Sequence, residues 1–245
     1  MTPTESFVSH LIELRDRLLR AFVGLLVVFL GLFPFANEVY ALLAAPMLDK
    51  LPEGTQMIAT AVVTPFFVPM KVAMMAAFVI SLPNTLYQLW MFVAPGLYAH
   101  EKKLMLPAIM VSSLLFLCGM AFAYFLVFPV VFSFIVSSAP AGVAVMTDIA
   151  EYLDFVMTLF LAFGLAFEVP IAVVLMARFG WVNVKQLQEA RSYVVVGAFV
   201  LAAIFTPPDI ISQFMLAVPL WFLYEAGILF VKITQSKSNS IHAEL

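Results

Sequence analysis

The chain has 245 residues, of which 64% are hydrophobic and only 11% are charged, with a formal net charge of -3 at pH 7. A soluble protein carries roughly 25% charged residues, and a soluble domain of this length could not bury so much apolar side chain, so the composition predicts a protein that lies largely in lipid. It excludes a disordered chain, a soluble secreted protein and a nucleic-acid-binding protein. The single cysteine excludes an internal disulfide.

Six apolar runs, bounded by charged or turn-forming residues, are expected to span the membrane as helices. They cover residues 20–36, 68–94, 104–136, 152–177, 193–206 and 210–231. The fifth run makes only ~21 Å of helix, against a hydrocarbon core of ~30 Å. Six spans therefore fit this pattern, and so do five spans with one re-entrant hairpin.

The fold predicted from these runs is one all-α membrane domain over residues 1–234, followed by a polar tail, 235–245, that we expect to be disordered. The segments 37–67 and 137–151 are expected to form a cap on the outer surface. Prolines inside the spans remove backbone hydrogen-bond donors and kink helices, which favours a concave wall, although proline is also common in straight-running membrane helices. These prolines are Pro83, Pro107, Pro129, Pro170 and Pro219.

The basic residues predict the orientation of the chain in the membrane. With a cytoplasmic N-terminus, only Lys50 and Lys71 of the 12 basic residues lie outside. The other basic residues then lie inside: Arg15, Arg17, Arg20, Lys102, Lys103, Arg178, Lys185, Arg191, Lys232 and Lys237. By the positive-inside rule, both termini are expected in the cytoplasm.

Catalytic motifs of membrane enzymes are missing from the sequence. His100-Glu101 is not followed by the second histidine of an H-E-x-x-H metalloprotease motif, and there is neither a G-x-S-x-G serine motif nor a Walker-type phosphate loop. We therefore expect neither an enzyme nor a cofactor or metal site.

Two acidic residues on the expected cytoplasmic side are candidates for ligand binding. Glu13 lies in an amphipathic segment before the first span, where Glu13 and Arg17, like Asp16 and Arg20, have the spacing of paired surface charges. Glu101 lies in the short loop after the second span, where a solvated loop charge is the simpler interpretation. Together the two carboxylates could instead receive a cationic ligand, preferably a guanidinium, whose donor fork matches a carboxylate.

A third acidic residue, Glu168, falls inside the fourth span, where a charge costs at least ~2.5 kcal/mol. Either it serves a function in a polar cavity, or it is a neutral group that bonds to backbone freed by Pro170. A proton-coupled small-molecule transporter that uses Glu168 is the alternative function. Such a transporter is expected to have a second intramembrane charge and paired discontinuous helices, and neither is evident in the sequence.

Five ordered segments of the chain resemble motifs of the TatC family, the multispanning core subunits of the twin-arginine protein translocase. They are H-L-I-E-L-R at 10–15, F-V-A-P-G-L followed by H-E-K-K within 92–103, and the segments 119–125, 163–170 and 206–209. The resemblance covers essentially the whole chain. One departure is Ala61, which stands where members of the family often carry an acid, so no role is carried over to that position.

The resemblance implies a receptor in the bacterial inner membrane for signal peptides of folded proteins, which carry two consecutive arginines. It also implies a scaffold for the single-span subunits TatA and TatB and for further TatC-like protomers, with export driven by the proton-motive force. The family's signal-binding carboxylates correspond to Glu13 and Glu101, with Arg15, Arg17, Phe92, Pro95 and Leu97 as supporting residues at the same surface.

The resemblance also assigns roles to residues away from that surface. Thr206 and Gln213 belong to the side that docks TatA and TatB, and Pro46 belongs to an external loop needed for activity. Glu168 is the intramembrane polar residue of the motif that ends in Pro170.

Overall fold

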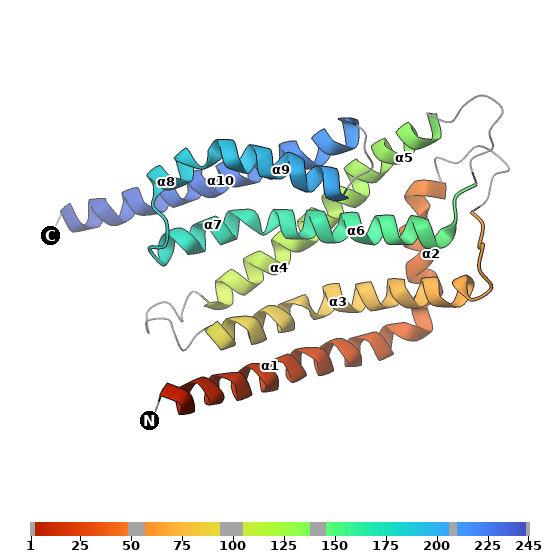
Figure 1. Ribbon diagram of the computed structural model, residues 1–245, viewed down its shortest axis with the longest axis horizontal. Coiled ribbons are helices and arrows are strands. Elements are labelled where there is room, and N and C mark those ends of the chain that lie inside the picture. Colours follow the sequence, from red (N-terminus) through yellow and green to blue (C-terminus); the bar gives the residue numbers. More distant parts are fainter. Residues whose placement is uncertain (1–2, 49–56, 94–104, 138–145, 206–209, 244–245) are drawn as a thin grey trace. The chain divides into compact units, whose positions relative to one another are not determined.

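The computed structural model describes residues 3–48, 57–93, 105–137, 146–205 and 210–243 (Figure 1). These residues form α1 (Pro3–Leu32), η1 (Phe33–Phe35), α2 (Ala36–Leu48), α3 (Thr64–Val93), α4 (Met105–Phe122), η4 (Ala123–Val127), α5 (Phe128–Ser137), α6 (Ile149–Phe167), α7 (Val169–Arg178), α8 (Val184–Glu189), α9 (Arg191–Phe205) and α10 (Ile210–Ala243). Within these ranges, the only β-structure is an isolated bridge between Ile58 and Asp148.

Five stretches of helix are long and apolar enough to cross a membrane. They are Ser9–Ala45, Thr64–Leu89, Leu106–Ser137, Ile149–Arg178 and Ile210–Ile233. The fifth predicted span corresponds to α9, which is a shorter apolar helix of 15 residues. The prediction of an all-α, multi-pass membrane protein is confirmed for the described residues, while the crossing by α9 stays a prediction.

Two of the predicted prolines lie where the helix geometry changes. The π-helical segment η4 ends at Val127, two residues before Pro129. Glu168 separates α6 from α7 and lies two residues before Pro170. A proline cannot donate the backbone bond that would continue a regular helix, which is the physical reason for a break at these places. In contrast, α3 and α10 continue through Pro83 and Pro219. The concave wall therefore stays a prediction.

The last helix is longer than the predicted span 210–231. It continues to Ala243, through most of the segment that we expected to be disordered. From Lys232 to Ala243 the sequence contains neither proline nor glycine. Because propagation of a helix costs far less than its nucleation, nothing in this segment stops the helix that begins in the apolar part.

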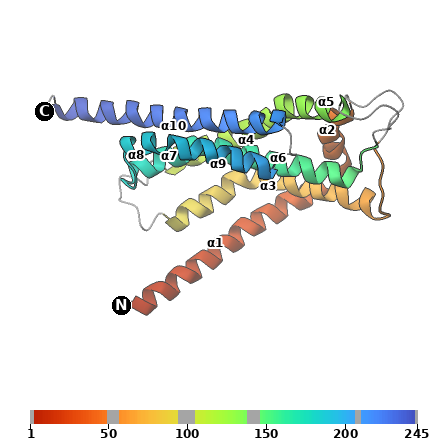
Figure 2. The ribbon, with the colours of Figure 1, turned by 45° about the horizontal axis from the view of Figure 1, so that its top comes forward.

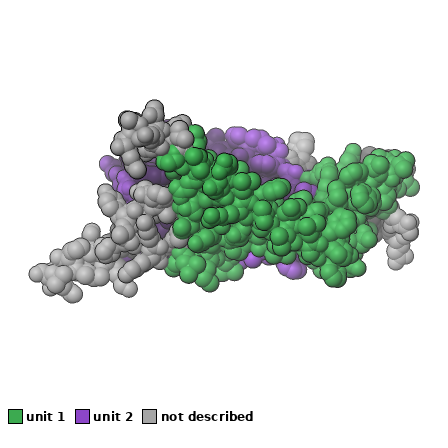
Figure 3. Space-filling model, turned by 90° about the horizontal axis from the view of Figure 1, so that it is seen from below, with its two compact units in different colours: residues 1–114, 145–154 green, residues 115–144, 155–245 purple. Residues whose placement is uncertain are grey.

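The chain divides into two compact units, shown by colour in Figure 3. Unit 1 comprises Met1–Leu114 and Val145–Asp154, and unit 2 comprises Leu115–Ala144 and Phe155–Leu245. In unit 1, α1 packs along α3 in the opposite chain direction, and α2 also packs against α3 (Figure 1). In unit 2, α10 packs against α7, α8 and α9, which lie beside it in both ribbon views (Figure 2).

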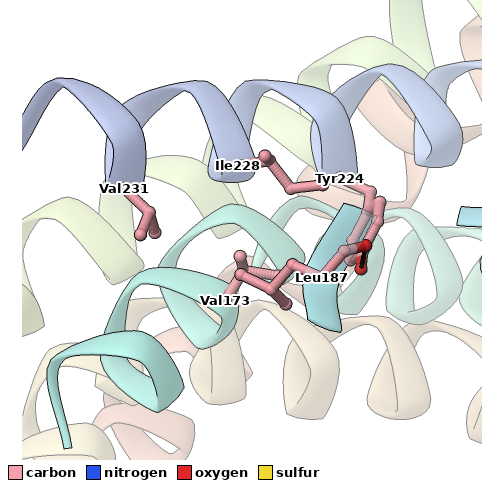
Figure 4. Packing of buried hydrophobic residues seen from close by; sticks show 5 residues of the cluster. All are labelled: Val173, Leu187, Tyr224, Ile228 and Val231. Carbon is pink, nitrogen blue, oxygen red and sulfur yellow. Dashed lines mark hydrogen bonds between the residues drawn. The ribbon is translucent and has the colours of Figure 1, made fainter. Parts of the chain in front are cut away.

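One buried hydrophobic cluster of unit 2 joins α7, α8 and α10. Figure 4 shows its buried residues, Val173, Leu187, Tyr224, Ile228 and Val231. The Tyr224 hydroxyl donates a hydrogen bond of 2.7 Å to the Leu187 carbonyl oxygen, so the one polar group of this cluster is satisfied. The short helix α8 is fixed at its start by a capping box between Asn183 and Gln186.

Two segments of unit 1, one before α3 and one at the start of α6, are joined by main-chain and side-chain hydrogen bonds. Ile58 donates to the Thr147 carbonyl oxygen at 3.0 Å, and Ile149 donates to the Ile58 carbonyl oxygen at 2.9 Å. The Asp148 carboxylate accepts from the Thr60 amide at 3.0 Å, from the Thr60 hydroxyl and from the Ala150 amide at 2.7 Å. These donors lower the pKa of Asp148 below 3.8, with the Thr60 hydroxyl as the largest cause.

Two side-chain contacts add to this connection. The Tyr152 hydroxyl donates to the Leu43 carbonyl oxygen of α2 at 2.9 Å, and Lys71 of α3 pairs with Asp154 at 2.9 Å. The two segments predicted to form a cap are thus connected within unit 1. Their position outside the membrane stays a prediction.

Candidate functional site

The end of unit 1 where α1 begins and α3 ends carries the predicted carboxylate Glu13. The less exposed residues of α1 include a row with the three-to-four-residue spacing of one helix face: Glu13, Arg17, Ala21, Gly24 and Val28. The neighbouring apolar residues Leu11, Leu14 and Leu18 are exposed, at 48%, 38% and 68%. This end of α1 therefore turns Glu13 and Arg17 toward the protein and its leucines outward.

Glu13 forms an ion pair with Arg17 one turn later, as the spacing predicted. The Nε and Nη2 atoms of Arg17 both donate to Oε1 of Glu13, and the Nε bond is 3.0 Å long. The side chain of Arg17 is only 15% exposed and that of Glu13 is 32% exposed. Since both bonds go to Oε1, the other carboxylate oxygen, Oε2, receives none of the Arg17 donors.

The second predicted pair of this segment is different from the expectation. Asp16 bonds to Arg15 at 3.0 Å and 2.8 Å, and not to Arg20. Arg15 is 67% exposed and Asp16 is 47% exposed, so this pair is more exposed than the pair of Glu13 with Arg17. A neighbour in the sequence reaches the carboxylate here because long exposed side chains adopt many rotamers in solvent.

Two contacts set the register of the α1–α3 seam, which we define as the facing sides of these two helices. The ring of Phe92 stacks on the ring of His10, with centroids 4.3 Å apart and planes 21° apart. Farther along, a Cβ atom on Gly24 would lie 2.5 Å from Nδ2 of Asn84, so glycine allows the close approach there. Glu13 and Arg17 lie on α1 between these two contacts, so the seam brings Phe92 to the same end as Glu13.

A polar residue that the sequence analysis missed also lies in this seam. Gln88 is between Asn84 and Phe92 on α3, and its Oε1 atom is buried and receives no hydrogen bond from the described residues. The signal in the sequence was a polar stripe on an apolar helix, formed by Ser81, Asn84, Thr85 and Gln88. Their spacing of three or four residues places them near one another on the helix surface.

Several predicted site residues fall outside what the structure describes. Glu101, Pro95, Leu97 and Thr206 lie in segments beyond the described ranges. For Pro46 only the backbone is described, near the end of α2. Their proximity to Glu13 or to other residues therefore stays a prediction.

The remaining predicted residues lie in unit 2. Glu168 is half-buried at the junction of α6 and α7, where its amide donates to the Leu165 carbonyl oxygen at 3.1 Å. Gln213 is half-buried in the first turn of α10, next to the buried Ser212. Both are polar positions on apolar helices, as predicted from the sequence.

Unit 2 also contains an ion pair that the sequence analysis did not predict. Nε of Arg191, at the start of α9, lies 2.6 Å from Oε1 of Glu225 on α10, and Nη2 donates to Oε2 at 2.7 Å. The pair is two-pronged and partly buried, with exposures of 44% and 27%. These residues are 34 positions apart in the sequence, so no local pattern predicts their contact.

The chemistry available at the Glu13 end is that of guanidinium binding. A carboxylate there faces the protein and already holds one guanidinium, an aromatic ring lies nearby, and an amide oxygen is buried in the same seam. Among the residues that the structure describes, no three histidine, cysteine or acidic side chains gather as metal ligands do. The described side chains at this end are therefore suited to binding a cationic group.

Comparison with known proteins gives a consistent result over the whole chain. The family model described as "Sec-independent protein translocase protein (TatC)" matches residues 9–219. The Sec-independent protein translocase protein TatC of Escherichia coli (strain K12) is 49% identical over 237 residues, which cover 97% of this chain and 92% of that protein. The TatC protein of Azotobacter chroococcum mcd 1 is 53% identical over 223 residues, covering 91% and 88% of the two chains.

A solved structure supports the same relationship in three dimensions. The crystal structure titled "Twin Arginine Translocase Receptor- TatC in DDM" matches with a TM-score of 0.80 at 36% sequence identity. The match covers 90% of this chain and 98% of that chain. The similarity therefore covers nearly all of the relative's chain.

Proposed function

Because the chain belongs to the TatC family of Sec-independent protein translocase proteins, we propose that it is the signal-peptide receptor of a twin-arginine translocase in a bacterial inner membrane. As a multi-pass membrane protein of this family, it is a subunit of a Sec-independent protein translocase. The proposed ligand is the arginine pair in the signal peptides of folded precursor proteins. A solved relative is itself titled a twin arginine translocase receptor, which supports this role.

The observation that carries the proposal is the ion pair of Glu13 with Arg17. It shows that this carboxylate, on the protein-facing side of α1, accommodates a guanidinium. Because Arg17 uses only Oε1, a second guanidinium can approach Oε2 without displacing the first. Such charge-assisted bonds are roughly twice as strong as neutral ones, and they strengthen further where water is partly excluded.

The proposed site extends from Glu13 to the loop that follows α3. Glu101 is the proposed acceptor for the second arginine. The proposed supporting residues are Pro95 and Leu97 in that loop, Phe92 at the end of the seam, and Arg15 and Arg17 beside Glu13. A lysine pair would bind less well, since an ammonium cannot present the planar fork that two carboxylate oxygens match. Both termini would lie in the cytoplasm with this site, as the basic residues predict.

The proposed scaffold function uses other parts of the chain. Thr206 and Gln213 are proposed to dock the single helices of TatA and TatB, because polar side chains hold helices together in lipid at ~0.6–2 kcal/mol each. Pro46 is proposed to belong to an external loop needed for activity, and Glu168 to be the intramembrane polar residue of the family motif. The proton-motive force is proposed to drive export, and further TatC-like protomers are proposed partners. These assignments rest on the family and on the polar character of the positions.

Export in cells tests this function. A fluorescent cargo with an arginine-pair signal would be followed in cells whose own TatC is replaced by this chain or by its Glu13→Gln variant. Export is expected to fall at least tenfold with Glu13→Gln, since a neutral amide loses the charge-assisted pair. The matched control is Glu189→Gln, which removes an exposed carboxylate of α8 that belongs to no proposed site. Equal export by Glu13→Gln and the control would contradict the proposed role of Glu13.

A further inference from the structure

The buried amide oxygen of Gln88 is an unusual feature of the α1–α3 seam. Its Oε1 atom is buried, and none of the described residues donates a hydrogen bond to it. Buried polar atoms of folded proteins nearly always have a partner, because an unsatisfied acceptor forfeits its hydrogen bonds to water. An acceptor kept in this state calls for an explanation.

The other polar side chains of the stripe on α3 need no such explanation. The Ser81 hydroxyl donates to the Phe78 carbonyl oxygen at 3.0 Å, and the Thr85 hydroxyl donates to the Ser81 carbonyl oxygen at 3.2 Å. Both hydroxyls are thus satisfied within their own helix. No such bond to its own helix is made by Oε1 of Gln88.

The register of the seam places Gln88 opposite the segment that carries Glu13 and Arg17. On α3, Gln88 is four residues after Asn84, which faces Gly24, and four residues before Phe92, which stacks on His10. Residues four apart lie on one helix face, so Gln88 also faces α1. The midpoint between Gly24 and His10 on α1 is Arg17.

We propose that Oε1 of Gln88 is a neutral further acceptor for an arginine of the bound signal peptide, in addition to the carboxylate of Glu13 on the facing helix. This inference rests on the proposed receptor function. A guanidinium has five N–H donors, and a carboxylate pairs with two of them in a fork, so the remaining donors need further acceptors when the group enters a poorly solvated seam. An amide oxygen supplies one at a lower desolvation cost than another carboxylate.

Replacement of the Gln88 side chain tests the inference through binding and stability together. Gln88→Met keeps the length of the side chain but removes the acceptor, so we expect the arginine-pair peptide to bind the purified chain in nanodiscs about tenfold more weakly. The thermal midpoint of the free chain should stay equal or rise, because no existing bond is lost. Gln88→Glu keeps an acceptor oxygen at this position. It should retain binding within about threefold, because a carboxylate also accepts hydrogen bonds from a guanidinium.

Thr85→Val is the matched control, since it changes a neighbouring polar residue of the same stripe whose hydroxyl already bonds within α3. It should leave peptide binding unchanged. A lower thermal midpoint for Gln88→Met, with unchanged peptide binding, would show that Gln88 joins helices and would overturn the inference. Unchanged binding and unchanged stability would overturn it as well.

The inference and the proposed function fail in different ways. If the unmodified chain binds arginine-pair peptides selectively but Gln88→Met binds them equally well, only the role of Gln88 is wrong. If the unmodified chain shows no selectivity for arginine over lysine pairs, with and without TatB, the receptor function itself is wrong.

Discussion

Arg17 holds one oxygen of the Glu13 carboxylate with two of its nitrogens, on the side of α1 that faces α3. The pair leaves Oε2 of Glu13 outside this contact. Arg17 therefore fixes the orientation of the carboxylate while Oε2 can still accept hydrogen bonds from another group. In the proposed receptor, Arg17 is therefore a positioning residue for Glu13.

Substitution of Arg17 tests this positioning role. Arg17→Gln is expected to weaken binding of an arginine-pair signal peptide several-fold, because Glu13 then samples other rotamers. Arg17→Lys should restore part of the affinity, since an ammonium keeps the charge but not the two-pronged contact. Peptide titration by fluorescence anisotropy measures both. Tighter binding to Arg17→Gln would instead mean that Arg17 competes with the ligand for Glu13.

A glycine in unit 2 is predicted to be essential for helix packing. A Cβ atom on Gly119 of α4 would lie 2.4 Å from the Phe163 carbonyl oxygen of α6, which is backbone and cannot move aside cheaply. Gly119→Ala should therefore destabilise the chain by ~1–3 kcal/mol, measured as thermal or denaturant unfolding in detergent. Gly197→Ala is the control, because a Cβ there meets nothing within 4 Å and alanine favours a helix. Equal stability of the two variants would contradict this packing.

The ion pair of Arg191 with Glu225 is expected to contribute to the attachment of α9 to α10. A double-mutant cycle with Arg191→Met and Glu225→Gln should give a coupling energy of up to ~1 kcal/mol, since the pair is partly exposed and screened by solvent. The same cycle on Lys185 and Glu189, which are 3.9 Å apart and exposed at 85% and 65%, should give a coupling near zero. Indistinguishable couplings would show that the two-pronged geometry adds no stability.

Acid is predicted to weaken the connection between residues 58–60 and residues 147–150 of unit 1, because it protonates Asp148. The pKa of Asp148 is lowered below 3.8, chiefly by the bond from the Thr60 hydroxyl. A carboxyl whose pKa is lower in the folded state adds stability above its unfolded pKa and loses it as the pH falls through the folded value. Thermal midpoints from pH 7 to pH 3 should therefore fall more for the unmodified chain than for Asp148→Asn.

Thr60→Val serves as a second check on this acid sensitivity. It removes the bond that lowers the pKa most, so it should also reduce the loss of stability below about pH 4. A pH dependence that is the same in all three proteins would show that Asp148 does not connect these segments in solution.

Local patterns predicted much of the fold and part of the site. Apolar length placed the five long helical stretches, and the four-residue spacing predicted the pair of Glu13 with Arg17. The same logic failed for Asp16, which bonds to Arg15, because exposed charges have several partners within reach. The helical end of the chain was also missed, since polar composition says little about a helix that has already begun.

Contacts between distant segments could not be predicted from the sequence. The bridge between Ile58 and Asp148, the pair of Arg191 with Glu225 and the position of Gln88 opposite α1 depend on how helices pack. Such contacts leave no periodic signal in a single sequence, because each partner lies dozens of residues from the other. The polar stripe on α3 was visible, but only the α1–α3 register shows what it faces.

Binding of fluorescent signal peptides to the purified chain in nanodiscs tests the receptor function most directly. Peptides with an arginine pair and with a lysine pair would be titrated against the unmodified chain and against Glu13→Gln, with TatB present and absent. We predict at least tenfold tighter binding of the arginine pair to the unmodified chain, and loss of that preference in Glu13→Gln. Equal affinity of both peptides for both proteins, also with TatB, would contradict a receptor in which Glu13 receives a signal arginine.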